Sequence, residues 1–178
     1  LSALDSKTRD DARANQLFLD ILTSRKNPER VLRLMNESGV FGRFLPDFGR
    51  IVAMMQFDMY HSYTVDEHTL KAIGILHGIE TGALRQAAPI ATEVMPEIGS
   101  RRALYVAMLL HDIAKGRGGN HSVLGAEVAL VVATACCAWQ YLATAASKLG
   151  TTGPCVKKSE RSTLTAALMS ASLMLWRP

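Results

Sequence analysis

The sequence predicts an all-α fold on the basis of three observations. Apolar residues recur three and four positions apart between turn signals, which is the spacing of one helix face. Residues that begin and end helices fall at matching places, and the 178 residues contain no β-hairpin signal and no internal repeat. Hydrophobic residues make up 48% of the chain, which is enough to bury a core.

The first predicted helix covers residues 9–26. Its apolar residues Leu17, Phe18, Ile21 and Leu22 are spaced to share one face. The pattern therefore predicts one apolar face on this helix.

A second helix is predicted from "NPERVLRLMNESG". Asn27 suits the N-cap, Pro28 suits the first helical position, and Gly39 suits the position after the last turn. The chain should turn near Pro46. A further helix is expected over residues 48–57, "FGRIVAMMQF".

A fourth helix should begin within "YTVDEHTLKAIGILHGIE". Thr64 and Glu67 have the spacing of a capping box, and His68 then falls in the first helical turn. The apolar residues that follow His68 at helical spacing are Ala72, Ile75, Leu76 and Ile79. This spacing places His68 on the apolar face of the helix.

The next helix is predicted over residues 101–116, after a loop or broken helix at 88–100. Residues 103–110 are apolar on all sides, as in a central buried helix. Lys115 suits the last turn, and Gly116 suits the position just beyond it.

The chemistry of this chain is carried by His68, His111, Asp112, Lys115 and His121. Imidazoles and a carboxylate without thiolates suit a divalent cation that acts as a Lewis acid. Successive helical residues point about 100° apart, so the remaining ligands of such an ion must come from other helices. His68 is the first candidate, and His121 could reach a second ion or the substrate. Lys115 is placed to balance charge on a phosphoryl oxygen. The alternative is that the histidines only pack in the core and Lys115 is a charge at a helix end.

These motifs resemble the HD superfamily of metal-dependent phosphohydrolases. "YHSYTVDEHTL" and "LLHDIAKGRGGNHSVLGAE" are most similar to the HD domain of the bifunctional uridylyltransferase/uridylyl-removing enzymes, which are bacterial nitrogen sensors. The upstream "RLMNESGVFGRFLPDFGRIVAMMQFDMYH" resembles the segment that joins the nucleotidyltransferase and HD domains of those enzymes. The resemblance covers about residues 10–130.

The resemblance implies a function and a set of site residues. In that family the HD domain hydrolyses the UMP–tyrosine phosphodiester on the PII signalling protein, with Mg²⁺ or Mn²⁺ as cofactor. The metal ligands correspond to His68, His111 and Asp112, with His121 as an additional ligand. Asp112 and Lys115 are the catalytic candidates, and Lys115 matches the lysine of the H-D-x-x-K pattern.

The chain departs from the family pattern after these motifs. The pattern ends in an aspartate on a later helix, whereas no aspartate follows Asp112 and the later acids are Glu127 and Glu160. We therefore expect the C-terminal part of the HD domain to be incomplete and the hydrolase activity to be low or absent.

The resemblance divides the chain into three parts. Residues 1–58 form a helical segment before the HD domain, 59–130 form a partial HD core, and 131–178 are a divergent tail. All three cysteines lie in this tail, two of them adjacent, and form no disulfide framework, so a reducing cytoplasm is expected. The uncharged stretch 128–147 is poor in Leu, so a membrane span is not favoured. The net charge of +4 permits an anionic partner but is too small and dispersed for nucleic-acid binding.

Two other functions stay open at this stage. The chain could be an HD phosphohydrolase that acts on a free nucleotide. It could also be a non-catalytic helical remnant or interaction module, in which the histidines pack or bind metal structurally.

Overall fold

The computed structural model describes residues 6–55, 63–115 and 117, and all regular structure in these ranges is helical. The predicted all-α class is therefore confirmed. The elements are α1 (Ser6–Asp10), α2 (Ala12–Leu22), α3 (Pro28–Glu37), α4 (Val40–Phe44), α5 (Pro46–Gly49), α6 (Val65–Glu80), α7 (Pro89–Val94), the 3₁₀ helix η1 (Met95–Glu97) and α8 (Arg101–Leu110).

The N-terminal region contains two helices where the apolar spacing predicted one. Asp11 lies between α1 and α2, and its carboxylate accepts a hydrogen bond from the Ala14 amide at 2.8 Å, which caps α2. The helix ends at Leu22 rather than at residue 26. Leu22 is fully buried, but Leu17 is 54% exposed, so the apolar face of this helix is not buried along its whole length.

The predicted boundaries of α3 are confirmed. The Asn27 side chain accepts a hydrogen bond from the Arg30 amide, and Pro28 occupies the first helical position. Gly39 follows the helix with a φ of +70°, a conformation that residues other than glycine adopt at a cost.

The helix expected over residues 48–57 is wrong in the part that the structure describes. The chain does turn before Pro46, but α5 ends at Gly49 and the following residues form turns. Ala53 has a φ of +57°, outside the helical region, and its amide donates to the carboxylate of Asp66 at 3.2 Å. Capture of this amide by a side chain from α6 replaces a helical hydrogen bond.

α4 and α5 approach each other closely at two glycines. A Cβ atom built on Gly42 would lie 2.8 Å from the Cα of Gly49. The neighbouring rings of Phe41 and Phe48 stack with centroids 3.9 Å apart, and both side chains are fully buried. The absence of a side chain at the glycines therefore permits the stacking of the two rings.

α6 begins where the sequence predicted, with Thr64 as the N-cap residue. The capping box does not form, because the Thr64 side chain makes no capping hydrogen bond. Glu67 instead pairs with Arg33 of α3, which also pairs with Glu29 at 2.9 Å. Arg33 on α3 therefore pairs with the Glu67 carboxylate, which the sequence spacing had assigned to the cap of α6.

α8 follows the short helices α7 and η1, which match the broken helix expected over residues 88–100. Near its start, Arg101 forms an ion pair with Glu80 at the end of α6. The hydroxyl of Tyr105 donates to the same carboxylate at 2.8 Å. These contacts fix α8 against the C-terminal turn of α6.

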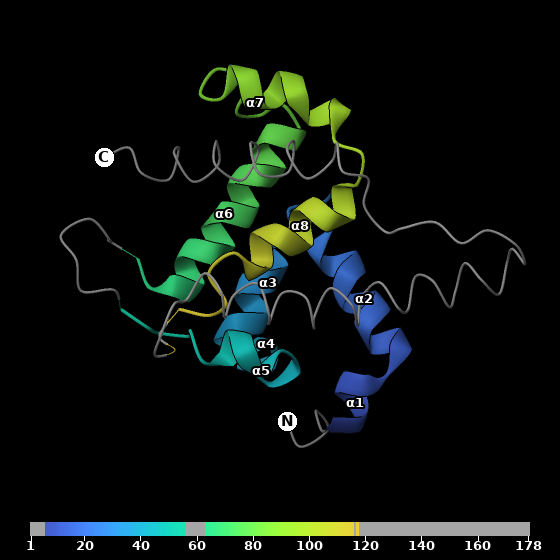
Figure 1. The fold of residues 1–178 in the computed structure, drawn as a ribbon, viewed down its shortest axis with the longest axis vertical. Helices are drawn as coiled ribbons and strands as arrows, with labels where there is room; N and C mark the ends of the chain where they lie inside the picture. Colours follow the sequence, from blue (N-terminus) through green and yellow to red (C-terminus); the bar gives the residue numbers. More distant parts are fainter. Residues whose placement is uncertain (1–5, 56–62, 116, 118–178) are drawn as a thin grey trace, which may run out of the picture.

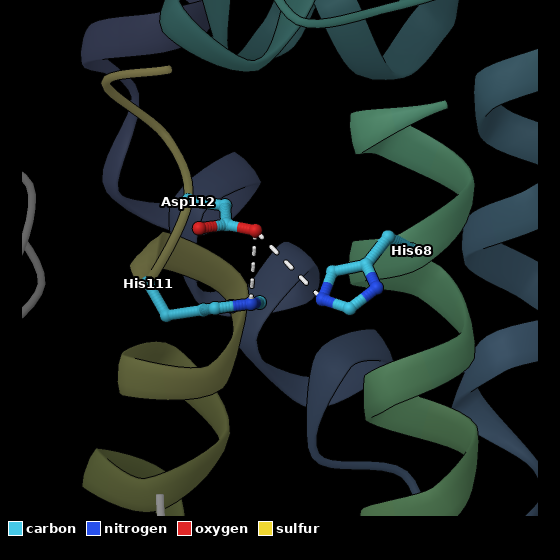
Figure 2. Close-up of side chains that lie close together, drawn as sticks. All are labelled: His68, His111 and Asp112. Atoms are coloured by element: carbon cyan, nitrogen blue, oxygen red, sulfur yellow. Dashed lines mark ion pairs between the residues drawn. The ribbon is translucent and has the colours of Figure 1, made fainter. Parts of the chain in front are cut away.

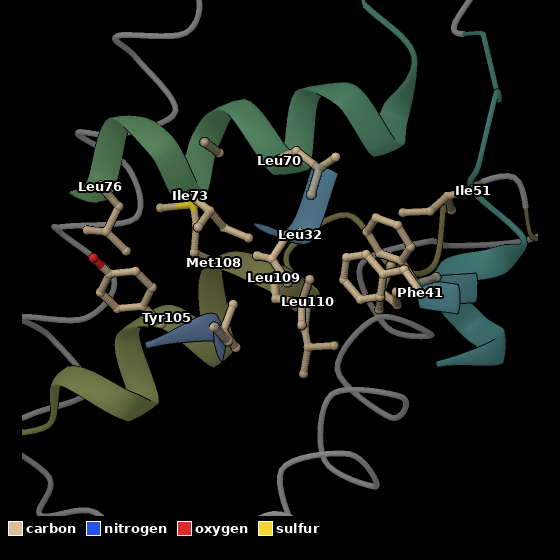
Figure 3. Packing of buried hydrophobic residues seen from close by; sticks show 14 of the residues in the cluster. Leu32, Phe41, Ile51, Leu70, Ile73, Leu76, Tyr105, Met108, Leu109 and Leu110 are labelled. Atoms are coloured by element: carbon tan, nitrogen blue, oxygen red, sulfur yellow. The ribbon is translucent and has the colours of Figure 1, made fainter. Parts of the chain in front are cut away.

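One hydrophobic core joins the helices, with α6 packed against α3, α7 and α8 (Figure 1). It includes Leu22, Leu32, Phe41, Phe48, Ile51, Leu70, Ile73, Leu76, Tyr105, Met108, Leu109, Leu110 and Ile113 (Figure 3). Residues on both sides of position 58 contribute to it. Within the described part of the chain, no helix is long and apolar enough to cross a membrane.

Candidate metal centre

His68 is the fourth residue of α6 and lies on the side of that helix that faces the end of α8 (Figure 2). Leu70 and Ala72, close to it in sequence, are buried in the core, and the His68 side chain is 21% exposed. The apolar packing of α6 therefore fixes the backbone that carries this imidazole, while its ring stays accessible.

His111 and Asp112 follow directly on the last residue of α8. The helix was predicted to continue through Lys115, but it ends at Leu110 and the next residues form tight turns. The Ile113 amide bonds to the Leu110 carbonyl at 3.2 Å, and the Lys115 amide bonds to the Asp112 carbonyl at 3.0 Å. This i→i+3 pattern tightens the backbone at the helix end.

The three predicted ligands meet in one place. Oδ2 of Asp112 lies 3.3 Å from Nε2 of His111 and 3.8 Å from Nε2 of His68 (Figure 2). One ligand atom from each of the three residues lies within 4.8 Å of the other two. The two imidazole rings are 5.5 Å apart between centroids and tilted by 49°.

The orientation of His111 is set by the backbone of α8. Its Nδ1 lies 2.6 Å from the carbonyl oxygen of Met108, an acceptor, so Nδ1 carries the hydrogen and Nε2 faces Asp112. Burial opposes protonation of this imidazole, but the Asp112 carboxylate and the Met108 carbonyl outweigh burial and raise the pKa of His111.

Asp112 is a mostly buried carboxylate with cationic neighbours. Burial disfavours its charged form, yet the hydrogen bonds and charges of His111 and Lys115 hold the pKa of Asp112 well below its usual range. The Lys115 ammonium lies 2.8 Å from Oδ2. Lys115 was predicted at a helix end facing the substrate. In the structure it contacts the same oxygen as the two histidines.

The geometry fits a divalent cation. Two ligand atoms each about 2.1 Å from one ion lie roughly 3 Å apart at right angles and roughly 3.4 Å apart in a tetrahedron. The two separations that involve Asp112, 3.3 Å and 3.8 Å, approach those values, and all three ligand atoms lie within 4.8 Å of one another. Two imidazoles and a carboxylate from two chain segments form a donor set suited to a divalent cation, with positions left for water.

His121, which the motifs singled out, lies outside the described residues, as do His61 of the quoted "YHSYTVDEHTL", Gly116 and the whole tail. His77 is remote from the cluster along α6. Its Nε2 accepts a hydrogen bond from the Asn27 amide at 3.3 Å, which helps to hold the start of α3.

Asp66 is a supporting residue that the motifs did not indicate. It is buried, and its carboxylate accepts hydrogen bonds from the Asn36 side chain at 2.8 Å and from the Ala53 amide. It therefore joins the end of α3 and the turn at Ala53 to the first turn of α6, two residues before His68. The sequence alone does not distinguish Asp66 from any other acidic residue in the first turn of a helix, because its hydrogen-bond partners, Asn36 and Ala53, come from distant segments.

A separate hollow of about 500 Å³ is lined mainly by residues of α3 and α6. Glu29, Arg33, Glu67 and Lys71 line it, and none of the three clustered ligands does. Arg33 is paired with both glutamates, and the Lys71 ammonium lies 2.7 Å from the hydroxyl of Tyr63. The charges of this hollow are thus matched within the protein.

Comparison with known proteins shows which enzymes share the sequence that carries these ligands. A family model described as the uridylyltransferase GlnD third domain matches residues 1–44. The bifunctional uridylyltransferase/uridylyl-removing enzyme of Novosphingobium aromaticivorans is 68% identical over 127 residues, and those of Rhodospirillum rubrum and Azospirillum brasilense are each 66% identical, over 122 and 129 residues. The chain is related to the uridylyltransferase/uridylyl-removing enzymes.

The match covers most of this chain but a small part of each relative. The aligned residues make up 71%, 68% and 72% of the chain, and 14%, 13% and 14% of the three enzymes in the same order. No solved structure matches the chain. The resemblance inferred from the motifs is confirmed for a segment of these bifunctional uridylyl-removing enzymes.

Proposed function

We propose that His68, His111 and Asp112 form the metal centre of a phosphodiester hydrolase of the uridylyl-removing type. The observation that carries the proposal is the meeting of these three donors within 4.8 Å, from the first turn of α6 and the turn after α8. The proposed reaction is the release of UMP from the uridylylated PII protein, supported by the names of the relatives.

In this proposal the cofactor is Mg²⁺ or Mn²⁺, which would lower the pKa of a bound water and supply the hydroxide nucleophile. The hydrogen bond from Nδ1 of His111 to the Met108 carbonyl keeps Nε2 available as a donor atom. Asp112 remains anionic at neutral pH because its pKa is lowered. Lys115 would exchange its contact with Asp112 for a phosphoryl oxygen of the substrate, where its charge stabilises the transition state.

The proposed partner and cellular setting come from the same resemblance. PII is an expected partner through its modified tyrosine, and the cytoplasm is the expected compartment. No aspartate follows Asp112 in this chain. We therefore expect metal binding by three protein donors but turnover well below that of a domain with a second carboxylate as its fourth ligand.

The first test is calorimetric titration of Mn²⁺ into the full chain and into Asp112→Ala. We expect roughly micromolar binding by the parent and none by the variant, because the substitution removes the only carboxylate of the cluster. Asp20→Ala is the matched control, since Asp20 is a well exposed carboxylate whose ion pair with Arg102 is remote in sequence from the ligands. Failure of the parent to bind Mn²⁺ would contradict the proposal.

The second test measures release of UMP from uridylylated PII, with free uridine nucleotides assayed in parallel. Slow Mn²⁺-dependent release from PII supports the proposal. Faster hydrolysis of a free nucleotide would assign the site to a different phosphohydrolase substrate class.

A further inference from the structure

Arg117 forms an ion pair with Asp47 in α5, a residue 70 positions earlier in the sequence. Arg117 lies two residues after Lys115, at the end of the described part of the ligand-bearing turn. Its side chain is 24% exposed, and that of Asp47 is 33% exposed. The pair is therefore partly shielded from solvent, and it joins the ligand-bearing turn to a helix that contributes no metal ligand.

The backbone of this turn has little regular support of its own. After α8 ends, the described amides of Ile113, Lys115 and Arg117 make only i→i+3 hydrogen bonds, of 3.2, 3.0 and 3.3 Å. The apolar side chains of Ile113 and Ala114 are buried in the middle of the segment. Beyond the ligands, the turn is thus attached through these two buried side chains and through the Arg117 guanidinium, and before the ligands it is attached through α8.

α5 is a firm base for this attachment. The close backbone contact of Gly42 with Gly49 and the stacking of Phe41 on Phe48 fix α5 against α4. A second cation near Asp47, Arg50, is 67% exposed and lies 3.9 Å from the same carboxylate, so its contact is longer and less shielded than that of Arg117.

We propose that Asp47 and Arg117 are positioning residues that hold His111 and Asp112 in reach of His68. We call this ion pair the latch. The inference rests on the proposed metal centre for its functional meaning, but the latch itself is a structural claim about the turn. Neither latch residue belongs to the ligand cluster, and both act by holding the chain that follows Asp112.

The experiment compares Asp47→Asn and Arg117→Gln with a matched control pair, Asp20→Asn and Arg102→Gln. The control pair also joins an aspartate to an arginine from a distant segment, at 3.4 Å, but it is more exposed and lies at the start of α8. Each full-length variant is examined for Mn²⁺ affinity by calorimetry, for amide hydrogen exchange by NMR, and for its melting temperature.

We expect each latch variant to bind Mn²⁺ about tenfold more weakly, which is the usual size of the effect when a residue that orients metal ligands is lost. The amides of Ile113 and Lys115 should exchange about tenfold faster, while that of Leu104, inside α8, should not change. The control variants should change neither property. The charge-reversed double variant, Asp47→Arg with Arg117→Asp, should recover most of the affinity.

The outcomes separate the latch from the proposed function. Unchanged exchange at Ile113 and Lys115 in both latch variants would overturn the latch, whatever the metal data show. Faster exchange with unchanged Mn²⁺ affinity would overturn the positioning role. A parent protein that does not bind Mn²⁺ would refute the metal centre, while the exchange data would still decide whether Asp47 holds the turn.

Discussion

The close contact between α4 and α5 makes Gly42→Ala the most informative single substitution in the scaffold. A Cβ at position 42 would lie 2.8 Å from the Cα of Gly49, so the two backbones must separate by more than half an ångström to reach ordinary contact. Overpacking of this kind costs about 1–3 kcal/mol. The helix-propensity gain of alanine over glycine is at most about 1 kcal/mol, and it is smaller in a helix as short as α4.

The expected net loss is about 1–2 kcal/mol, or roughly 2–8 °C in melting temperature for a chain of this size. Gly74→Ala is the matched control. Its Cβ would meet mainly the carboxylate end of the Glu29 side chain, at 1.9 Å from Oε2 and 2.7 Å from Cδ. That flexible end can swing away at the cost of a partly exposed ion pair with Arg33, about 0.5 kcal/mol, which the propensity gain offsets. Thermal and urea unfolding of the full chain measure both variants, and a Gly42→Ala protein as stable as Gly74→Ala would refute the argument.

Three further predictions concern Glu80 and Asp112. Tyr105→Phe should lower the free energy of unfolding in urea by about 1–2 kcal/mol, because it removes the hydroxyl that donates to Glu80 at 2.8 Å. An unchanged urea midpoint would show that water replaces this hydroxyl as a donor to Glu80. Burial opposes the charge of Glu80, but its bonds to Arg101 and Tyr105 outweigh burial and lower its pKa in the folded state. Its stabilisation should therefore be complete above its ordinary pKa of 4.5 and be lost as the pH falls through the lower folded value, so the stability gap between parent and Glu80→Gln should narrow on acidification. Lys115→Met should bind Mn²⁺ about threefold to tenfold more tightly, because it removes a cation 2.8 Å from Oδ2 of Asp112, yet should hydrolyse substrate more slowly; weaker Mn²⁺ binding in calorimetry would contradict this.

Local signals in the sequence predicted the helix boundaries best where the interactions are themselves local. Asn27, Pro28 and Gly39 bound α3 as expected, because an N-cap, a first-turn proline and a left-handed glycine act within a few residues. Asp11 could have been recognised in the same way, since aspartate is a preferred N-cap residue just before an apolar helical pattern. Its carboxylate accepts the hydrogen bond of the Ala14 amide.

Boundaries that depend on distant partners were not predictable from spacing. The helix expected over residues 48–57 does not form in the described residues up to 55. The Ala53 amide instead donates a hydrogen bond to the carboxylate of Asp66. The capping box at Thr64 is absent because Glu67 pairs with Arg33. In both cases a side chain from another helix competes with a local hydrogen bond.

The candidate site also combines features that local sequence signals predict with features that depend on distant contacts. The apolar face of α6 predicted the inward placement of His68, and the structure brings His68 next to His111 and Asp112. The early end of α8 and the latch between Asp47 and Arg117 depend on tertiary contacts that the motif does not contain.

The end of α8 at Leu110 also determines which pole of that helix meets the histidines. The last carbonyl groups of a helix carry a partial negative charge, equivalent to about half an electron, because they lack the i→i+4 amide partners that carbonyls inside the helix have. His111 occupies this carbonyl pole, whereas His68 lies in the first turn of α6, at an amide pole with a partial positive charge. The cluster is thus set between two opposite helix poles. The carbonyl pole of α8 favours a cation beside His111, and the amide pole of α6 favours negative charge on the side of His68.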